Sequence, residues 1–272
     1  MASKAPTLTT PATERLFRSR PVPTAREDIP SETPPIFALP DQGQRDREVV
    51  ILVLARWRTS SVAWGLTQLA AGALRRESFP GLRWRKILGS GHQGGFGLRP
   101  GWDRLAQLCV FADVDQARHW LAEDAGLAAW KRRAEAFCWL ELQAWSSRGL
   151  WSGQPIAVTL PAAQPGPVAA LTRASIRPGK ARAFWSHSPP SEDALAQAPG
   201  CQLAIGLGEA PLLRQATFSV WDSVAAMEGY ARSGAHLEAI RHAYRDQYFS
   251  ESMFVRFSLT DQGGDWRAWR AH

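Results

Sequence analysis

The stretch FADVDQARHWLAEDAGLAAW, Phe111 to Trp130, has a diverged counterpart 110 residues further on, WDSVAAMEGYARSGAHLEAI, Trp221 to Ile240. Matches in one order at a constant offset indicate two copies of one structural unit. The offset of 110 aligns apolar residues at five places: Phe111 with Trp221, Val114 with Val224, Trp120 with Tyr230, Leu127 with Leu237, and Trp130 with Ile240.

Hydrophobic periodicity around these stretches predicts the order strand, helix, strand, strand, helix, strand, twice over. The first set covers 49–57, 61–76, 82–90, 105–112, 114–137 and 138–145. The second covers 168–176, 180–187, 201–208, 214–221, 223–247 and 252–259. This is the order of the ferredoxin-like unit, so we predict an α+β fold of tandem ferredoxin-like repeats. Two such units in one chain can pack sheet against sheet, as the two subunits of a dimeric α+β barrel do.

Composition divides the 272 residues into four segments. We predict a disordered extension over 1–48, which is rich in Pro, Thr, Ser and charge, and a linker over the Pro- and Gly-rich residues 154–167. The two repeats then cover 49–153 and 168–262.

Charge and cysteine content limit the classes of protein that the chain can belong to. The net charge is +7, and it is spread over residues 49–272 without a basic run. Such a surface suits nucleic acid, anionic lipid or an acidic protein partner, and equally a solvated face with no specific partner. Three cysteines without a CxxC pair argue against disulfides and cysteine-held metals and favour a reducing cytoplasm. No apolar run has the roughly 18 residues of a membrane span, and we expect no secretory signal.

His236 is the residue whose surroundings suggest a cofactor. It follows the small residues Ser233, Gly234 and Ala235, and the repeat places it opposite Gly126, so the first copy has no imidazole there. On a helix, Ser233 and Ile240 share the face of His236. These residues suit an axial ligand to a flat macrocycle, but they also suit a histidine on a helix surface or in a core.

Several longer motifs occur in a characteristic order. The C-terminal motifs are RQATFSVW (214–221), SGAHLEAIR (233–241) and FSESMFVRF (249–257). The others are GLRWRKILGSG (81–91), SSRGLWSGQPI (146–156) and LTRASIRPGKARAFWSH (171–187). Together these motifs resemble the spheroidene monooxygenase family. The resemblance runs from about Val49 to Trp266 and leaves out the N-terminal extension.

The resemblance implies a haem b enzyme that uses O2 and electrons from a reduced ferredoxin-type donor. Its substrates would be acyclic carotenoids, oxidised at the terminal C-2 methylene to a 2-hydroxy and then a 2-keto product. The enzyme would be cytoplasmic, with peripheral membrane contact and no nucleic-acid partner. Another haem monooxygenase and a non-catalytic haem- or lipid-binding protein remain the alternatives.

Within this resemblance, His236 is the expected iron ligand, and neutral imidazole suits that role. Arg214 and Gln215 are candidates to hold a haem propionate or oxygen. Cys201 is a second candidate for the axial position. Arg173 and Arg256, on predicted strands, would need charged partners if buried. The expected lining of the substrate site is Trp185, His187, Phe218 and Trp221.

Overall fold

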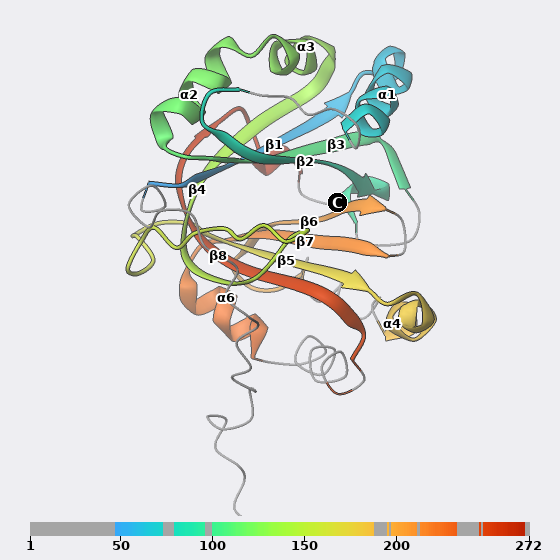
Figure 1. Ribbon diagram of the computed structural model, residues 1–272, viewed down its shortest axis with the longest axis vertical. Helices are drawn as coiled ribbons and strands as arrows, with labels where there is room; N and C mark the ends of the chain where they lie inside the picture. Colours follow the sequence, from blue (N-terminus) through green and yellow to red (C-terminus); the bar gives the residue numbers. More distant parts are fainter. Residues whose placement is uncertain are drawn as a thin grey trace, which may run out of the picture. The chain divides into compact units, whose positions relative to one another are not determined.

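The computed structural model describes residues 47–72, 79–95, 100–187, 197–210, 213–232 and 247–269, together with Leu195 and Arg245 (Figure 1). Eight strands form a closed antiparallel barrel in the order β1-β3-β2-β6-β7-β5-β8-β4. The first four are β1 (Val49–Trp57), β2 (Leu82–Gly91), β3 (Pro100–Phe111) and β4 (Ala134–Gly149). The others are β5 (Val168–Ile176), β6 (Cys201–Ala210), β7 (Arg214–Trp221) and β8 (Phe249–Gly263). Closure leaves no free strand edge.

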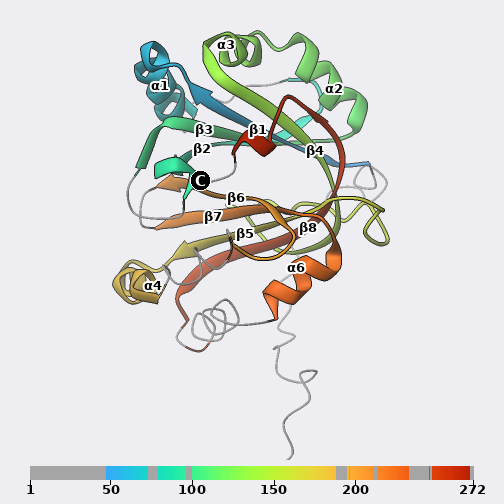
Figure 2. The ribbon, with the colours of Figure 1, turned by 180° about the vertical axis from the view of Figure 1, so that it is seen from behind.

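Among the described residues, more helices pack on the outside of β1–β4 than on the outside of β5–β8 (Figures 1 and 2). Three helices pack on the first four strands: α1 (Val62–Gly72), α2 (Val114–Glu123) and α3 (Ala125–Arg133). On the second four strands lies α6 (Val224–Ala231), and α4 (Ala181–His187) follows the end of β5. Short 3-10 helices are η2 (Thr59–Ser61), η3 (His92–Gly94), η4 (Pro178–Lys180) and η5 (Arg267–Trp269).

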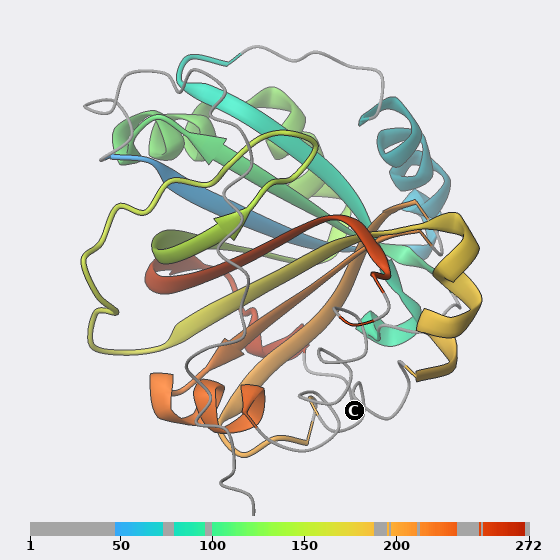
Figure 3. The ribbon, with the colours of Figure 1, turned by 60° about the horizontal axis from the view of Figure 1, so that its bottom comes forward.

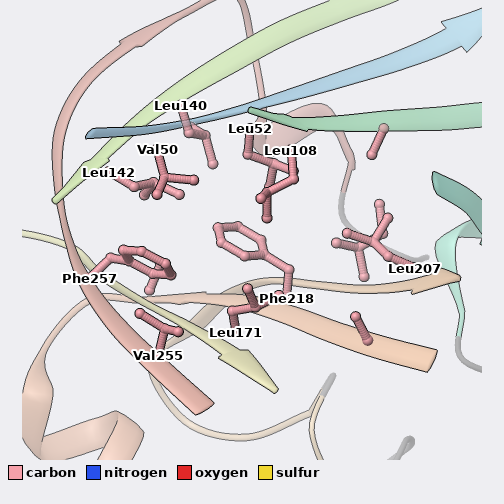
Figure 4. Close-up of a cluster of buried hydrophobic side chains, with 14 of the residues drawn as sticks. Val50, Leu52, Leu108, Leu140, Leu142, Leu171, Leu207, Phe218, Val255 and Phe257 are labelled. Atoms are coloured by element: carbon pink, nitrogen blue, oxygen red, sulfur yellow. The ribbon is translucent and has the colours of Figure 1, made fainter. Parts of the chain in front are cut away.

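Successive side chains of each strand point alternately into the barrel and outward, toward the helices. Leu52, Leu108, Leu140, Phe218 and Val255 point inward and are at most 1% exposed (Figure 4). The intervening residues of β1 and β3 point outward to α2 and α3, where they form a second core with Trp120 and Trp130. The barrel interior is therefore filled by side chains.

Two of the pairs aligned at an offset of 110 occupy equivalent places, while Leu237 and Ile240 lie outside the described residues. Phe111 and Trp221 end β3 and β7, and each contacts the aromatic ring nine residues later, Trp120 or Tyr230, with ring centroids 5.4 Å apart. The pairing order is also equivalent, β4-β1-β3-β2 in one half and β8-β5-β7-β6 in the other. The coarse prediction of an α+β fold is confirmed as an eight-stranded barrel with outer helices.

The single helix predicted over 114–137 is wrong. Asp124 has an extended backbone between the two helices. Its N–H donates to the Trp120 carbonyl at the end of α2, and its carboxylate caps α3 by accepting from the Leu127 N–H. The chain becomes a strand at Ala134, earlier than predicted, because the alternating residues of 134–149 pair with β1 and β8. Of the helices predicted over 61–76 and 223–247, the structure describes α1 over Val62–Gly72 and α6 over Val224–Ala231. Residues 73–76 and 233–244 lie outside the described residues. Of the extension predicted to be disordered over 1–48, residues 1–46 lie outside the described residues. The prediction is wrong for Glu48, which is buried beside β1 and pairs with Arg83 at 3.5 Å.

Residues 150–167, of which 154–167 are predicted as a linker, run from β4 to β5. Trp151 and Ile156 are buried in the barrel core, and the N–H groups of Thr159 and Leu160 donate to the Ala144 carbonyl. The Ala157 N–H donates to Glu48. The connection is thus attached to the barrel by both apolar and polar contacts.

Candidate functional site

The outward-facing side chains of β5, β6 and β7 are small. Those at the equivalent positions of β1–β4 are larger. Alternation from the inward-facing Leu171, Ile205 and Phe218 places these small residues outward. Register aligns them in rows across β6, β7 and β5. We call them the small-residue face: Ala170, Thr172, Ala174, Ala204, Gly206, Gly208, Thr217 and Ser219.

The equivalent face of the first half is filled. Counting from the strand starts, Ile51 and Val53 of β1 correspond to Ala170 and Thr172 of β5. Ile51 and Val53 are fully buried under helices, whereas Ala170 and Thr172 are only partly buried. The small-residue face spans two strand spacings by four residue rises, roughly 10 by 13 Å. Its size and low relief suit a flat ligand.

Polar groups border this face. Arg256 of β8 lies opposite Ala170 and forms an ion pair with Glu228 of α6, with 3.1 Å between nitrogen and oxygen. Its guanidinium also lies 5.5 Å from the ring centroid of Trp145. Gln215, half-buried, has its amide beside Gly208. The border therefore offers a cation and a hydrogen-bonding amide.

The helix α6 covers only one end of the small-residue face, through Met227, Tyr230 and their contacts with Val168 and Trp221 (Figure 3). The chain continues from α6 directly into residues 233–244, which lie outside the described residues. His236, Ser233 and Ile240 belong to that segment, so their predicted roles stay predictions.

The other predicted site residues do not gather on one surface. Phe218 is fully buried inside the barrel, while Trp221 points outward under α6 and donates from Nε1 to the Ser219 hydroxyl. Three residues apart on one strand, they face opposite sides and cannot line the same pocket. Trp185 lies on α4 beside Phe184, with ring centroids 5.3 Å apart. The side chain of His187 is not among those described.

Arg214 is exposed at the start of β7. Cys201 opens β6 with its thiol near the Leu203 carbonyl, at 3.5 Å. Among the described residues, no group of three or more His, Cys, Asp or Glu side chains is arranged to hold a metal ion. A metal ion bound by the described residues would therefore have fewer than three ligands of these types.

A second polar cluster lies inside the barrel at one end, and sequence reasoning found only one member of it. Arg173 is 2% exposed and forms an ion pair with Glu251. It forms a second ion pair with Glu209, with 3.5 Å between Nη2 and the carboxylate oxygen. Glu209 also pairs with Lys86 at 2.8 Å and accepts from Trp151 Nε1 at 2.9 Å. We call these residues the Arg173 cluster. The requirement that a buried Arg173 has a charged partner is confirmed.

Opposing effects act on the carboxylates of this cluster. Burial would raise the pKa of Glu209, but Lys86, Trp151 and Arg173 together hold it below its ordinary value. For Glu251, hydrogen bonds from the Gly153 and Ser152 N–H groups and the charge of Arg173 likewise outweigh burial and lower the pKa. Both carboxylates are therefore ionised at neutral pH. Because every charge has a partner, the cluster is structural in character.

The closed antiparallel barrel with helices on its outer faces places the protein among the eight-stranded α+β barrel proteins. The chain is 48% identical over 223 residues to a spheroidene monooxygenase of Rubrivivax gelatinosus, covering 82% of this chain and 86% of the relative. It is 35% identical to that of Rhodobacter capsulatus, covering 76% and 88%. The relative from Cereibacter sphaeroides is 34% identical, covering 75% and 64%. The chain belongs to the spheroidene monooxygenase family and is an oxidoreductase.

Solved structures share the fold at much lower identity. An aldoxime dehydratase superposes with a TM-score of 0.53 at 13% identity, covering 86% of this chain and 88% of its own. A second aldoxime dehydratase, crystallised with butyraldoxime, has a TM-score of 0.51 at 10% identity, covering 80% and 81%. No family model matches the chain. Within the described residues, the helices are too short or too polar to cross a bilayer.

Proposed function

We propose that this protein is a haem-dependent monooxygenase that acts on acyclic carotenoids. The observation that carries the proposal is its 48% identity, over most of both chains, to a protein named spheroidene monooxygenase. The expected reaction is stepwise oxidation of a terminal C-2 methylene, first to the 2-hydroxy and then to the 2-keto product. O2 and a reduced ferredoxin-type donor would supply oxygen and electrons.

The small-residue face fits haem b. Its low side chains allow a flat group to approach the sheet closely, and large residues fill the equivalent face of the other half. The segment after α6 carries His236, whose neutral imidazole would hold the haem iron. Arg256, Gln215 or Arg214 would hold the propionates, and Ser233 and Ile240 would lie beside the ring.

Haem, when bound, supplies the activation of O2 for attack on an unactivated C–H bond. The contribution of this chain would be to bind and orient. His236 would fix the haem, and its second nitrogen would need a hydrogen-bond partner to set the ring orientation. The apolar residues beside the face, including Phe254 of β8, would exclude water and receive the polyene.

We further propose that the two halves are diverged copies of one ferredoxin-like unit, of which only the second kept a cofactor site. The equivalent pairing order and the equivalent ring pairs support duplication. The substrate is dissolved in a bilayer, so a cytoplasmic enzyme would contact the membrane peripherally.

The first test of this proposal is the absorption spectrum of the purified protein beside His236→Ala, with haem supplied during expression. We expect a Soret band in the wild type that is lost or shifted in the variant. The same spectrum in both proteins would mean that another residue binds the iron, and His187→Ala and Cys201→Ala would identify it. A wild type that binds no haem would refute the haem mechanism.

The second test is turnover of spheroidene in detergent micelles with O2 and a reduced ferredoxin, followed by mass analysis of the products. Mass gains of one oxygen, and then the ketone, are expected. Haem binding without reductant-dependent O2 uptake would identify a binding protein instead.

A further inference from the structure

One end of the second half of the barrel is rich in exposed cations. Four neighbouring strands, in the pairing order β4-β8-β5-β7, reach this end: β4 and β5 finish there, and β7 and β8 begin there. Register confirms the proximity, because Ser175 of β5 lies opposite both Glu251 and Arg214. The helix α4 lies at this end and α6 at the opposite end (Figure 3). We call this the α4 end.

Five basic side chains of the α4 end are exposed, on β4, the residues after β5, α4 and β7. They are Arg148, Arg177, Lys180, Arg182 and Arg214. No ion pair is formed by any of them within the described part of the chain. The two acids described at this end, Glu209 and Glu251, are already paired to Lys86 and Arg173. Among the described residues, no acid therefore neutralises the positive charge of these five side chains.

Apolar groups accompany these cations. Leu150, two residues after Arg148, is 38% exposed and is one of the few large hydrophobic side chains exposed in the described residues. On α4, Phe184 lies between Trp185 and Phe249, with ring centroids 5.3 Å and 5.9 Å apart. Basic residues beside an exposed aliphatic chain and aromatic rings are typical of surfaces that lie in a membrane interface.

The opposite end of these strands is mixed in charge. Asp222 follows β7, and Asp261 and Asp265 lie at or just beyond the end of β8; all three are exposed, and Asp261 forms an ion pair with Arg118 at 3.5 Å. Arg232, exposed at the end of α6, pairs with Glu228. An anionic surface would therefore attract the α4 end more strongly than the other end, which defines an orientation.

We propose that the α4 end is the surface by which this enzyme docks on an anionic lipid bilayer. Arg148, Arg177, Lys180 and Arg182 contact the headgroups, and Leu150 enters the interface. Lipid is favoured over an acidic protein because the exposed Leu150 adds apolar contact to the charge. The surface is independent of haem and of turnover, so its test separates it from the proposed function.

The test is co-sedimentation of the full chain with phosphatidylcholine vesicles, with and without phosphatidylglycerol, at low and high salt. Lys180→Gln/Arg182→Gln is compared with Lys131→Gln/Arg132→Gln on α3, which removes the same charge from two other exposed residues. Each cation near an anionic surface changes the partition coefficient about five-fold, so the first variant should lose about 30-fold and the control less than two-fold. Leu150→Ser should weaken the binding that survives high salt.

Three outcomes would overturn the proposal. Wild-type protein that binds vesicles equally with and without phosphatidylglycerol would show that electrostatic docking does not occur. Equal losses of vesicle binding in both double variants would show that binding depends on net charge alone and not on the α4 end. Unchanged vesicle binding in Lys180→Gln/Arg182→Gln, with weaker binding of an acidic ferredoxin, would show that the α4 end docks a protein.

Discussion

Replacing Arg173 by methionine tests whether the Arg173 cluster holds the barrel closed. The β2–β6 seam has only two register pairs, Gly89 with Gly208 and Ser90 with Leu207, whereas other neighbouring strands share eight or more. Side chains must supplement it, and Lys86 bridges the seam to Glu209, which Arg173 also contacts. The cluster thus connects β2, β6, β5 and β8 where the backbone pairing is weakest.

The expected loss in the free energy of unfolding depends on the partners that Glu209 and Glu251 keep in the variant. Breaking a buried ion pair by removing one partner costs about 3–5 kcal/mol. In Arg173→Met, Glu209 keeps Lys86 and Trp151, and Glu251 keeps two backbone N–H groups at 3.0 Å. We therefore expect the lower figure, about 3 kcal/mol, which lowers Tm by about 6–12 °C in a domain of this size.

The assay is urea and thermal unfolding followed by circular dichroism, with Arg148→Met, an exposed arginine, as the control that changes stability by less than about 0.5 kcal/mol. The pKa values of Glu209 and Glu251 are lowered by folding, so their contribution is complete above the ordinary value of 4.5 and is lost as pH falls through the lower folded values. The difference between wild type and Arg173→Met should shrink below about pH 4.5. A variant within 1 kcal/mol of wild type at pH 7 would refute the stabilising role.

Two local features give further predictions. Asp124→Ala removes the cap whose carboxylate accepts from the Leu127 N–H at 2.6 Å, so it should cost about 1 kcal/mol in urea unfolding, and Asp124→Asn should restore most of the loss. Burial, with the charge of Asp265, raises the pKa of Cys138 to about 12, so its thiol should resist a disulfide reagent at pH 8 until the protein is unfolded. Modification of native Cys138 within minutes, located by mass spectrometry, would contradict the burial.

The sequence predicted all eight strands because alternation is a local signal that survives divergence. Strand ends were missed where pairing partners decide them: β3 begins at Pro100 and β8 runs to Gly263 through ladders that the local pattern does not encode. The break at Asp124 was missed although the signal, an aspartate three residues before Leu127, was present.

The candidate site was predictable only in part. That Arg173 needs a partner followed from its place on a buried strand, but Glu209 and Glu251 come from strands whose neighbours depend on barrel closure. The small-residue face was missed for a related reason. Ala170, Gly206 and Thr217 are unremarkable within their own strands, and only register places them side by side.

The contrast between the two outer faces leads to a test that needs no residue of the segment 233–244. Ala170→Ile/Thr172→Val transfers to β5 the residues found at the equivalent places of β1, Ile51 and Val53. Both substitutions favour strands and add apolar surface, so the barrel should retain its Tm within a few degrees. If haem lies on the small-residue face, the added bulk should remove the Soret band while far-UV circular dichroism stays unchanged. A variant that keeps the wild-type spectrum would show that the cofactor binds elsewhere, and the small size of these residues would then have no role in binding it.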